Sequence, residues 1–350
     1  MTQTMIGSNK SYPPGRPLNL KRHAQIIATG AGVPDEVVTN QDLIDEMNLI
    51  ATDRAVQFSI GIKERRRAPF TADPSIYLER AARSCIERAG ISPEKIDRII
   101  YAKLFGDYLV PATALKVLER LGIRKEIPAM DLSAACSGVM HAVDVALSFI
   151  NAGDDYVLVV GGDRTTLSKH SVVQKDTRTV FLNGDGFAAI LLGPSPVQRF
   201  HAKYFYTDSD LFDFAYIPFG TELINKDREF GPKMLAMTMP DGQNIHKSVL
   251  DSCRIISNRL LSLTGQTMDD IDFFITSDQT HLVWQDQLKL LGVPEEKSIS
   301  CFQKLGNTVA AMTPLNLHEA VTQGLLRRGM TVMMMGHGAG AAGGGFIFTY

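Results

Sequence analysis

The chain has 350 residues, which is about two domains' worth of sequence and enough to bury a sizeable core. Hydrophobic residues make up 45% and charged residues 21%, which excludes the disordered, collagen-like and low-complexity classes. With 36 basic and 38 acidic residues the net charge is −2, so charge gives no reason to expect nucleic acid or an anionic membrane as a partner.

Targeting and cysteine patterns bound the compartment. The first residues contain no apolar signal-peptide core, and no stretch approaches the ~18 apolar residues of a membrane helix. We therefore predict a flexible tail over residues 1–20 and a cytoplasmic protein without membrane contact. The four cysteines are widely spaced, which predicts reduced thiols and neither a metal site nor a disulfide framework. They are Cys85, Cys136, Cys253 and Cys301.

Strand-like apolar runs alternate with helix-like segments along the chain. Residues 74–90 are typical of a helix that stops at Gly90. Residues 96–102 and residues 156–161 are typical of buried strands. Strands and helices that alternate at this spacing predict an α/β fold with mostly parallel sheets.

An internal echo indicates duplication. Residues 89–102 and residues 264–277 contain, in the same order, a glycine that ends a helix, an Ile-Asp pair and an apolar strand. Two similar halves are the economical interpretation. The Pro-rich stretch near residue 196 would then divide the chain into an N-terminal half over 21–195 and a C-terminal half over 196–350.

Cys136 stands in a setting that suits a nucleophile. It follows two alanines and precedes a segment, 139–150, that is apolar at helical spacing. The free N–H groups and the dipole of a helix N-terminus favour a thiolate, and would lower the thiol pKa from about 8.5 toward neutrality. Small neighbours would let an acyl group reach the sulfur. The same pattern is compatible with a small buried core cysteine.

Several motifs, in the same order, resemble the ketoacyl synthase III branch of the thiolase superfamily. The segment DLSAACSGVMHAVDVA resembles its nucleophile motif, and the resemblance covers nearly the whole chain. The other motifs are ATGAGVPDEVVTNQDL (28–43), GIKERRRA (61–68), LVPATALKVLERLGI (109–123), NGDGFAAILLG (183–193), KLGNTVAAMTPLNLHEAV (304–321) and GHGAGAAGGGFIF (336–348).

The resemblance implies a fold and a reaction. The fold is a thiolase-like five-layered α-β-α-β-α arrangement of two duplicated halves, usually a homodimer. Members of the branch take an acyl group from a thioester onto the cysteine, here Cys136. They pass it to a second substrate, most often a malonyl-carrier protein that loses carbon dioxide.

The family's catalytic set is Cys, His and Asn, and this chain matches it only in part. Asn307 matches the Asn, whose amide can donate to a thioester carbonyl as it becomes an enolate. The position of the His falls on Ser277, which can only hydrogen-bond a substrate or a water. Asp278 follows it and His281 lies four residues further on, so both are candidates for the missing function.

The last hairpin offers another histidine. His337 falls where ketoacyl synthases III carry a Phe beside the cysteine and where thiolases carry an acid–base cysteine. An imidazole with a pKa near 6.5 suits proton transfer, so we predict that His337 supplies it. The alternative is a packed histidine in place of an aromatic ring. The backbone near Gly338 and Ala339, with that of Cys136, is predicted to form the oxyanion hole.

Two departures from the family bear on the substrates. The family's adenine-binding Trp and Arg positions hold Ala55 and Ser59, which favours a carrier-protein thioester over coenzyme A as donor. The branch that joins two acyl chains head to head has a Glu base where this chain has Val110. We therefore expect no such condensation, and Val110 is predicted to line the acyl pocket of the partner in the homodimer.

We conclude that the sequence predicts an acyltransferase of the ketoacyl synthase III type with an atypical base, in specialised polyketide or fatty-acid-derived metabolism. It would need no cofactor and would act on an acyl carrier protein. Two alternatives stay open. One is an ordinary decarboxylative β-ketoacyl-carrier-protein synthase III that forms a C–C bond, and the other is a non-catalytic partner subunit. The acyl chain and the bond formed (C–C, C–O or C–N) are not determined.

Overall fold

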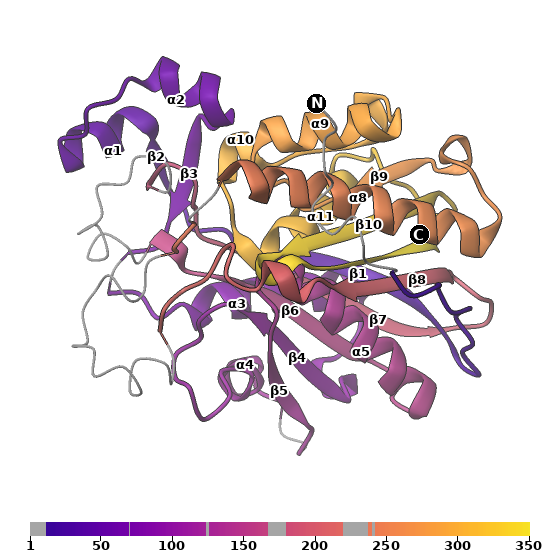
Figure 1. The fold of residues 1–350 in the computed structure, drawn as a ribbon. Helices are drawn as coiled ribbons and strands as arrows, with labels where there is room; N and C mark the ends of the chain where they lie inside the picture. Colours follow the sequence, from indigo (N-terminus) through magenta and orange to yellow (C-terminus); the bar gives the residue numbers. More distant parts are fainter. Residues whose placement is uncertain (1–11, 70, 124–125, 167–179, 220–236, 240–241) are drawn as a thin grey trace.

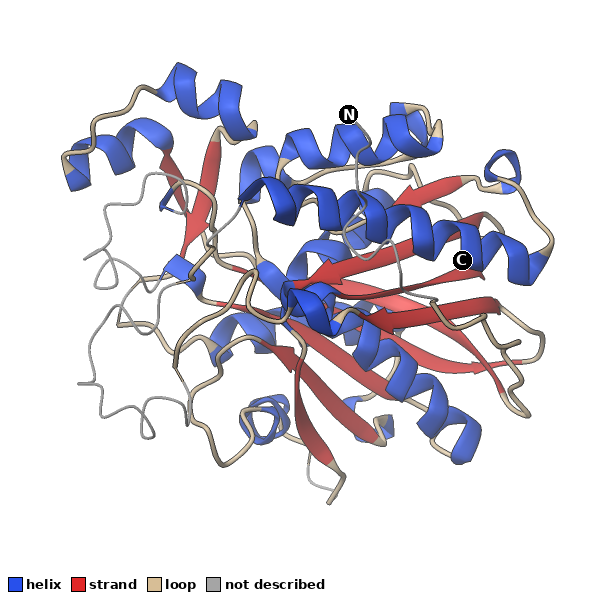
Figure 2. Cartoon of the chain, in the orientation of Figure 1, coloured by secondary structure: helices blue, strands red, loops and turns tan. Residues whose placement is uncertain are grey.

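The computed structural model describes residues 12–69, 71–123, 126–166, 180–219, 237–239 and 242–350 (Figures 1 and 2). The first of its two large sheets has the strand order β1-β7-β6-β4-β5. Strand β4 is parallel to both of its neighbours, and β7 is antiparallel to both of its own. The strands are β1 (His23–Ala31), β4 (Arg98–Lys103), β5 (Ala129–Ser133), β6 (Val157–Asp163) and β7 (Gly186–Ser195).

The second sheet repeats this topology. Its order is β8-β11-β10-β9, with β9 parallel to β10 and β11 antiparallel to both neighbours. A further parallel bridge, from Phe274 to Ser298, stands where the first sheet has β5. The strands are β8 (Phe200–Thr207), β9 (Phe273–Ile275), β10 (Thr331–Gly338) and β11 (Ala342–Thr349).

Helices form three layers around and between the two sheets (Figure 1). One pair packs on the outer face of the first sheet, one pair fills the space between the sheets, and one pair covers the second sheet. In that order the helices are α3 (Ser75–Ala89) and α4 (Ala114–Leu121), α5 (Gly138–Ala152) and α11 (Met312–Thr322), and α8 (Gly242–Thr264) and α9 (His281–Leu291). The five-layered arrangement of two similar halves is therefore confirmed, and the boundary at residue 195 stays a prediction.

The predicted local elements agree with the structure. The helix expected over 74–90 is α3, and it ends at Gly90, which adopts the left-handed conformation with φ 66°. Only glycine takes that conformation without steric cost, and it is a common way to end a helix. The strands expected over 96–102 and 156–161 are β4 and β6.

The two similar segments, residues 89–102 and residues 264–277, have the same structural role in the two halves. The backbone N–H of Asp97 donates to Tyr156 O (2.9 Å) and its carboxylate accepts the N–H of Tyr156 (3.0 Å), where β6 starts. The backbone N–H of Asp272 donates to Thr331 O (3.0 Å) and its carboxylate accepts the N–H of Thr331 (2.8 Å), where β10 starts. Each aspartate thus aligns its strand with the next parallel strand.

A small lobe stands beside the two sheets (Figure 1, purple). Buried Arg65 donates to Asn40 Oδ1 (2.8 Å) within the lobe, and to the carbonyl of Phe181 (2.8 Å), which lies outside the four elements of the lobe. Burial lowers the pKa of Arg65 to about 10. The lobe contains β2 (Glu36–Thr39), β3 (Glu64–Arg67), α1 (Asn40–Met47) and α2 (Asp53–Ile60).

Short helices join the larger elements. They are α10 (Phe302–Leu305) and the 3₁₀ turns η1 (Pro93–Lys95), η2 (Ala135–Ser137), η4 (Ser209–Leu211), η6 (Met268–Asp270), η7 (Glu295–Lys297), η8 (Val309–Ala311) and η9 (Ala339–Ala341).

The described part of the predicted N-terminal tail begins at residue 12. From residue 12 on it packs on the second half of the chain, where the hydroxyl of Tyr204 donates to Pro13 O (3.1 Å) and Arg259 donates to Tyr12 O (3.2 Å). These contacts place Tyr12 and Pro13 against the second half, and the flexible tail over residues 1–20 stays a prediction. Residues 1–11 lie outside the described part of the chain.

One helix also corrects the expectation drawn from hydropathy. By length and composition alone, the segment Ala135–Ala152 is apolar enough to cross a membrane. In the fold it contains α5, whose buried residues form part of the core between the two sheets. Its apolar character is therefore explained by burial within the protein.

Candidate active site

A cavity of about 410 Å³ brings together residues from both halves. The predicted site residues Cys136, Asn307, His337, Gly338 and Ala339 all line it. Most of its wall is apolar. Examples of the apolar lining are Leu182, Leu211, Phe214, Met239, Leu282 and Val283.

Cys136 lies in the turn η2, directly before α5, as the sequence predicts. The pKa of its thiol is shifted in the direction opposite to the prediction. Burial raises the pKa of the Cys136 thiol to about 12, and the nearby carboxyl of Asp163 acts in the same direction. The expected lowering of the pKa is therefore wrong, because desolvation of the thiolate outweighs the stabilisation by backbone N–H groups.

Backbone strain gathers around the cavity. Ala135, Val309 and Ala341 have positive φ angles of 46°, 54° and 46°, which is unusual for residues other than glycine. They lie in the turns η2, η8 and η9, and Val309 and Ala341 line the cavity. Such conformations cost about 1–3 kcal/mol each and persist where packing over-determines them, often at functional sites.

The loop that carries Asn307 is fixed on both sides. Its N–H donates to Leu182 O (2.8 Å), and its carbonyl accepts the N–H of Gly184 (3.1 Å). The side-chain Oδ1 accepts the N–H of Val309 (2.9 Å), so Oδ1 and Nδ2 are unambiguously placed. Nδ2 has no protein partner within the described residues. It is therefore available to donate to a ligand in the cavity.

His337 stands at the end of β10, with its ring between two serines of α8. Nδ1 lies 2.7 Å from Ser252 Oγ, and Nε2 lies 3.5 Å from Ser248 Oγ. Burial lowers the pKa of His337 to about 4. The expected value near 6.5 is therefore wrong, and the imidazole is neutral at neutral pH.

Ser277 is close to the site but does not line the cavity. Its Oγ accepts the backbone N–H of His337 (2.9 Å) and donates weakly to the carbonyl of the same residue (3.4 Å). Both bonds face β10, and the side chain is fully buried. The predicted contact of Ser277 with substrate is therefore not supported, because its hydroxyl is used to hold His337.

The two other candidates for the missing base also point elsewhere. The buried carboxyl of Asp278 accepts from Asn316 Nδ2 (2.8 Å) and Ser300 Oγ (2.6 Å), and burial raises the pKa of Asp278 to about 6. His281 begins α9 and stacks on Trp284, with ring centroids 5.2 Å apart. Neither Asp278 nor His281 lines the cavity.

Gln279 is a cavity residue that the sequence did not single out. Its Nε2 donates to the carbonyl of His337 (3.0 Å), and its side chain lines the cavity. The only available signal was its place in the segment that aligns with the family's His motif. Gln279 lines the cavity because its side chain points there after the end of β9, and no sequence pattern reports that direction.

At the predicted oxyanion hole, the backbone of Gly338 lies close to the backbone of residues 134–137. A Cβ built on Gly338 would lie 3.0 Å from the backbone nitrogen of Ser137 and 3.2 Å from Ala134 O. Glycine therefore allows the end of β10 to approach the turn that carries Cys136. Among the described residues, no cluster of three or more His, Cys, Asp or Glu side chains could hold a metal ion.

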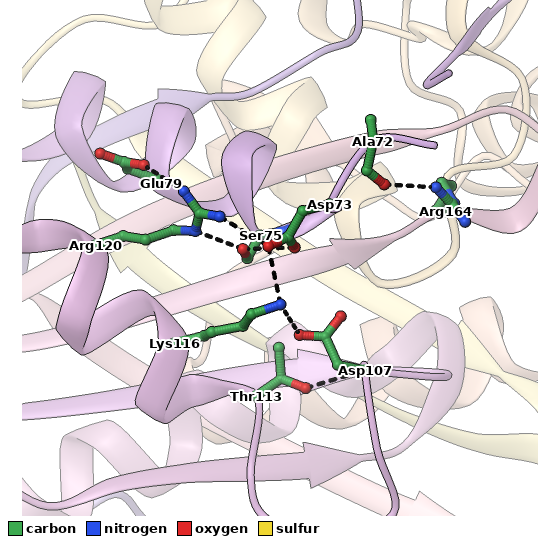
Figure 3. A network of polar contacts seen from close by, with 9 residues as sticks. All are labelled: Ala72, Asp73, Ser75, Glu79, Asp107, Thr113, Lys116, Arg120 and Arg164. Carbon is green, nitrogen blue, oxygen red and sulfur yellow. Dashed lines mark hydrogen bonds and ion pairs between the residues drawn. The ribbon is translucent and has the colours of Figure 1, made fainter. Parts of the chain in front are cut away.

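Val110 lies outside the cavity of its own chain, on a loop whose tip is exposed. Leu109 and Val110 are 87% and 80% exposed. The base of the loop is held by a polar network, in which Lys116 contacts both Asp73 (2.9 Å) and Asp107 (3.0 Å), and Arg120 contacts Asp73 (2.7 Å) (Figure 3). The tip is thus an apolar projection on an anchored base.

Comparisons with known proteins agree with this geometry. The family models described as 3-oxoacyl-[acyl-carrier-protein (ACP)] synthase III and its C-terminal part match residues 130–209 and residues 261–350. The β-ketoacyl-[acyl-carrier-protein] synthase III of Methylococcus capsulatus is 31% identical over 332 residues, which are 95% of this chain and 100% of that protein.

Solved structures give the same result. The 3-oxoacyl-(acyl carrier protein) synthase III of Pseudomonas aeruginosa superposes with a TM-score of 0.83 at 27% identity, covering 94% of this chain and 98% of that one. The priming β-ketosynthase of the R1128 polyketide pathway has a TM-score of 0.84 at 25% identity, covering 96% and 98%.

The fold and the cavity define a thiolase-like protein of the acyl-transferring, condensing class. Within that class, the chain belongs to the 3-oxoacyl-[acyl-carrier-protein] synthase III family.

Proposed function

We propose that the protein transfers an acyl group from a carrier-protein thioester through Cys136 to a second substrate. The observation that carries the proposal is the convergence of the Cys136 thiol and the free Asn307 amide on one apolar cavity. In the first step the Cys136 sulfur forms a thioester with the acyl carbon. The carrier's thiol leaves with the proton that Cys136 gives up.

The donor is an acyl chain on a carrier protein. Ala55 and Ser59, at the positions of the family's adenine-binding Trp and Arg, offer no stacking surface and no cation. Ser59 lines the cavity, and its hydroxyl is bonded to Val56 O (3.1 Å). The relatives named above carry the acyl carrier protein in their names. The proposal needs no cofactor and keeps the cytoplasmic location and the specialised pathway that the sequence predicts.

The proposal includes a homodimer. Exposed Leu109 and Val110 at an anchored loop tip are suited to an apolar contact with a second copy, in which Val110 would line the partner's acyl pocket. The network around Lys116 would hold the loop in place before the partner arrives (Figure 3). Such preorganisation lowers the entropy cost of association.

An ordinary decarboxylative synthase that forms a C–C bond is the second candidate. It is favoured by Asn307, because loss of carbon dioxide places negative charge on a thioester oxygen that Nδ2 can stabilise. A non-catalytic subunit is disfavoured, since it has no use for Cys136 or for an unpaired amide in a strained loop.

The test measures the mass of the intact protein after incubation with a panel of acyl-carrier proteins and the matching acyl-coenzymes A. We expect one acyl group per chain, faster from the carrier protein, and none on Cys136→Ala. Cys301→Ala is the matched control, because Cys301 does not line the cavity. Acylation that persists on Cys136→Ala, or equal rates from both donors, contradicts the respective part of the proposal.

A further inference from the structure

Two elements, α8 and β8, place hydroxyl groups around the ring of His337. In the register of the second sheet, Tyr206 on β8 and His337 on β10 both lie opposite Gly343 on β11. Residues directly opposite one another share a face of the sheet, so the two side chains lie on the same side. Helix α8 packs on this face and presents Ser248 and Ser252, which are one turn apart.

The two ring nitrogens of His337 have different surroundings. Nδ1 contacts Ser252 Oγ (2.7 Å), and Ser252 in turn contacts the hydroxyl of Tyr206. Nε2 is nearest to Ser248 Oγ (3.5 Å), and Ser248 lines the cavity whereas Ser252 does not. Nε2 is therefore on the cavity side of the ring, and Nδ1 faces the interior.

The proton on the ring can be assigned from the serine on the cavity side. Ser248 donates its own hydroxyl proton to Ile245 O (2.8 Å), so its oxygen can only accept from His337. A proton on Nε2 fits this 3.5 Å contact, whereas an unprotonated Nε2 would face a second acceptor. Because burial lowers the pKa of His337 to about 4, the ring is neutral and Nδ1 carries none.

The interior chain of hydroxyls fits the same assignment. Ser252 donates to the unprotonated Nδ1 of His337, and its oxygen accepts from the hydroxyl of Tyr206. In the opposite direction the proton of Tyr206 would be buried without an acceptor within the described residues. A buried donor without an acceptor loses its hydrogen bonds to water and gains none in return, which disfavours that direction.

We propose that Ser252 and Tyr206 are positioning residues that hold His337 in the Nε2-protonated tautomer, so that the imidazole serves the cavity as a hydrogen-bond donor and not as a base. A fixed donor suits a carbonyl oxygen that gains negative charge as the acyl group is transferred. The role in the reaction rests on the proposed function, whereas the tautomer does not.

The tautomer is tested by ¹⁵N–¹H NMR of the histidine rings in the full-length protein at pH 7. The signals of His337 are identified by their loss in His337→Phe. We expect a proton on Nε2 and none on Nδ1 in the unmodified chain. Ser252→Ala should move this pattern toward the Nδ1-protonated form, and Ser252→Thr, which keeps a hydroxyl, should preserve it.

Ser257→Ala is the matched control, because Ser257 is buried on the same helix but donates to Arg254 O (3.2 Å). It should leave the His337 signals unchanged. A proton on Nδ1 in the unmodified chain, or an unchanged tautomer in Ser252→Ala, overturns the proposal.

Kinetics test the role in the reaction separately. Loss of an oriented donor costs on the order of 10²–10³-fold in kcat, so a partly misoriented ring in Ser252→Ala should lose about ten-fold or more. KM should change little, and Ser252→Thr should restore kcat. An unchanged kcat despite an altered tautomer overturns the donor role. If no donor acylates the protein at all, the proposed function fails, and NMR still decides the tautomer.

Discussion

Cys136 is a residue on which position in the chain and burial act in opposite directions. Its place before α5 gives it backbone N–H groups, and its surroundings take water away from the sulfur. The net effect raises the thiol pKa to about 12, so the side chain proposed as the nucleophile rests as a thiol. The thiolate has to form when the substrate is in place.

The raised pKa predicts how Cys136 reacts with an alkylating reagent. Because the pKa is about 12, the thiolate fraction should grow about ten-fold per pH unit from pH 7 to pH 10 without levelling off. The rate is measured by mass spectrometry with iodoacetamide, using Cys136→Ala as the blank. A plateau near pH 8 would show a thiol of ordinary or lowered pKa.

At the scale of elements, short turns hold the reacting groups. The turns η2 and η8 and the loop before η8 pack directly on one another's backbones. The chain at Gly184 packs closely on the segment just before Asn307, because a Cβ built on Gly184 would lie 1.9 Å from Leu305 O. Its N–H also donates to Asn307 O (3.1 Å). The Gly-Asp-Gly strand motif therefore acts as a support for the Asn307 loop.

Gly184→Ala should accordingly displace the Asn307 loop. We expect a loss of about 1–3 kcal/mol in unfolding free energy, as for other overpacked sites, together with a slower second half-reaction. Urea unfolding and single-turnover transfer measure the two effects. Gly242→Ala is the control for stability alone, since a Cβ built on Gly242 would have no other atom within 4 Å but Gly242 lines the cavity. Unchanged stability and transfer in Gly184→Ala would contradict the assigned role.

At the scale of the whole molecule, the two halves complete one cavity. The first half supplies Cys136 and the second supplies Asn307 and His337, so neither half contains the site alone. The exposed loop tip at Leu109 and Val110 extends this logic to a second copy. An exposed apolar tip on a rigid base is typical of a surface that binds a partner.

In the proposed homodimer, Leu109→Asp is expected to shift the equilibrium from dimer toward monomer. A carboxylate buried without a partner at the proposed apolar contact would cost several kcal/mol, which weakens the association. Light scattering after size-exclusion chromatography gives the mass. Ile50→Asp is the control, because Ile50 is fully exposed on another part of the surface. A dimer that persists in Leu109→Asp would contradict the proposed interface.

Local sequence patterns and motifs were enough to predict the fold class and to single out Cys136 and Asn307. Apolar periodicity and helix-ending glycines are local signals, so the helix that ends at Gly90 and the strands β4 and β6 could be located from them. The motifs around Cys136 and Asn307 indicated the proposed nucleophile and the amide. Both residues line the cavity, where the proposal assigns them their roles.

The protonation of Cys136 and His337 and the directions of several side chains follow from the tertiary structure. The pKa of Cys136 and of His337 depends on how much water reaches each side chain, which no sequence pattern reports. Packing between elements far apart in the chain also sets the direction of three side chains. The hydroxyl of Ser277 points toward β10, Gln279 lines the cavity, and Ser252 contacts His337. Such contacts exist only after the second sheet and α8 have come together, which is why the structure was needed to find them.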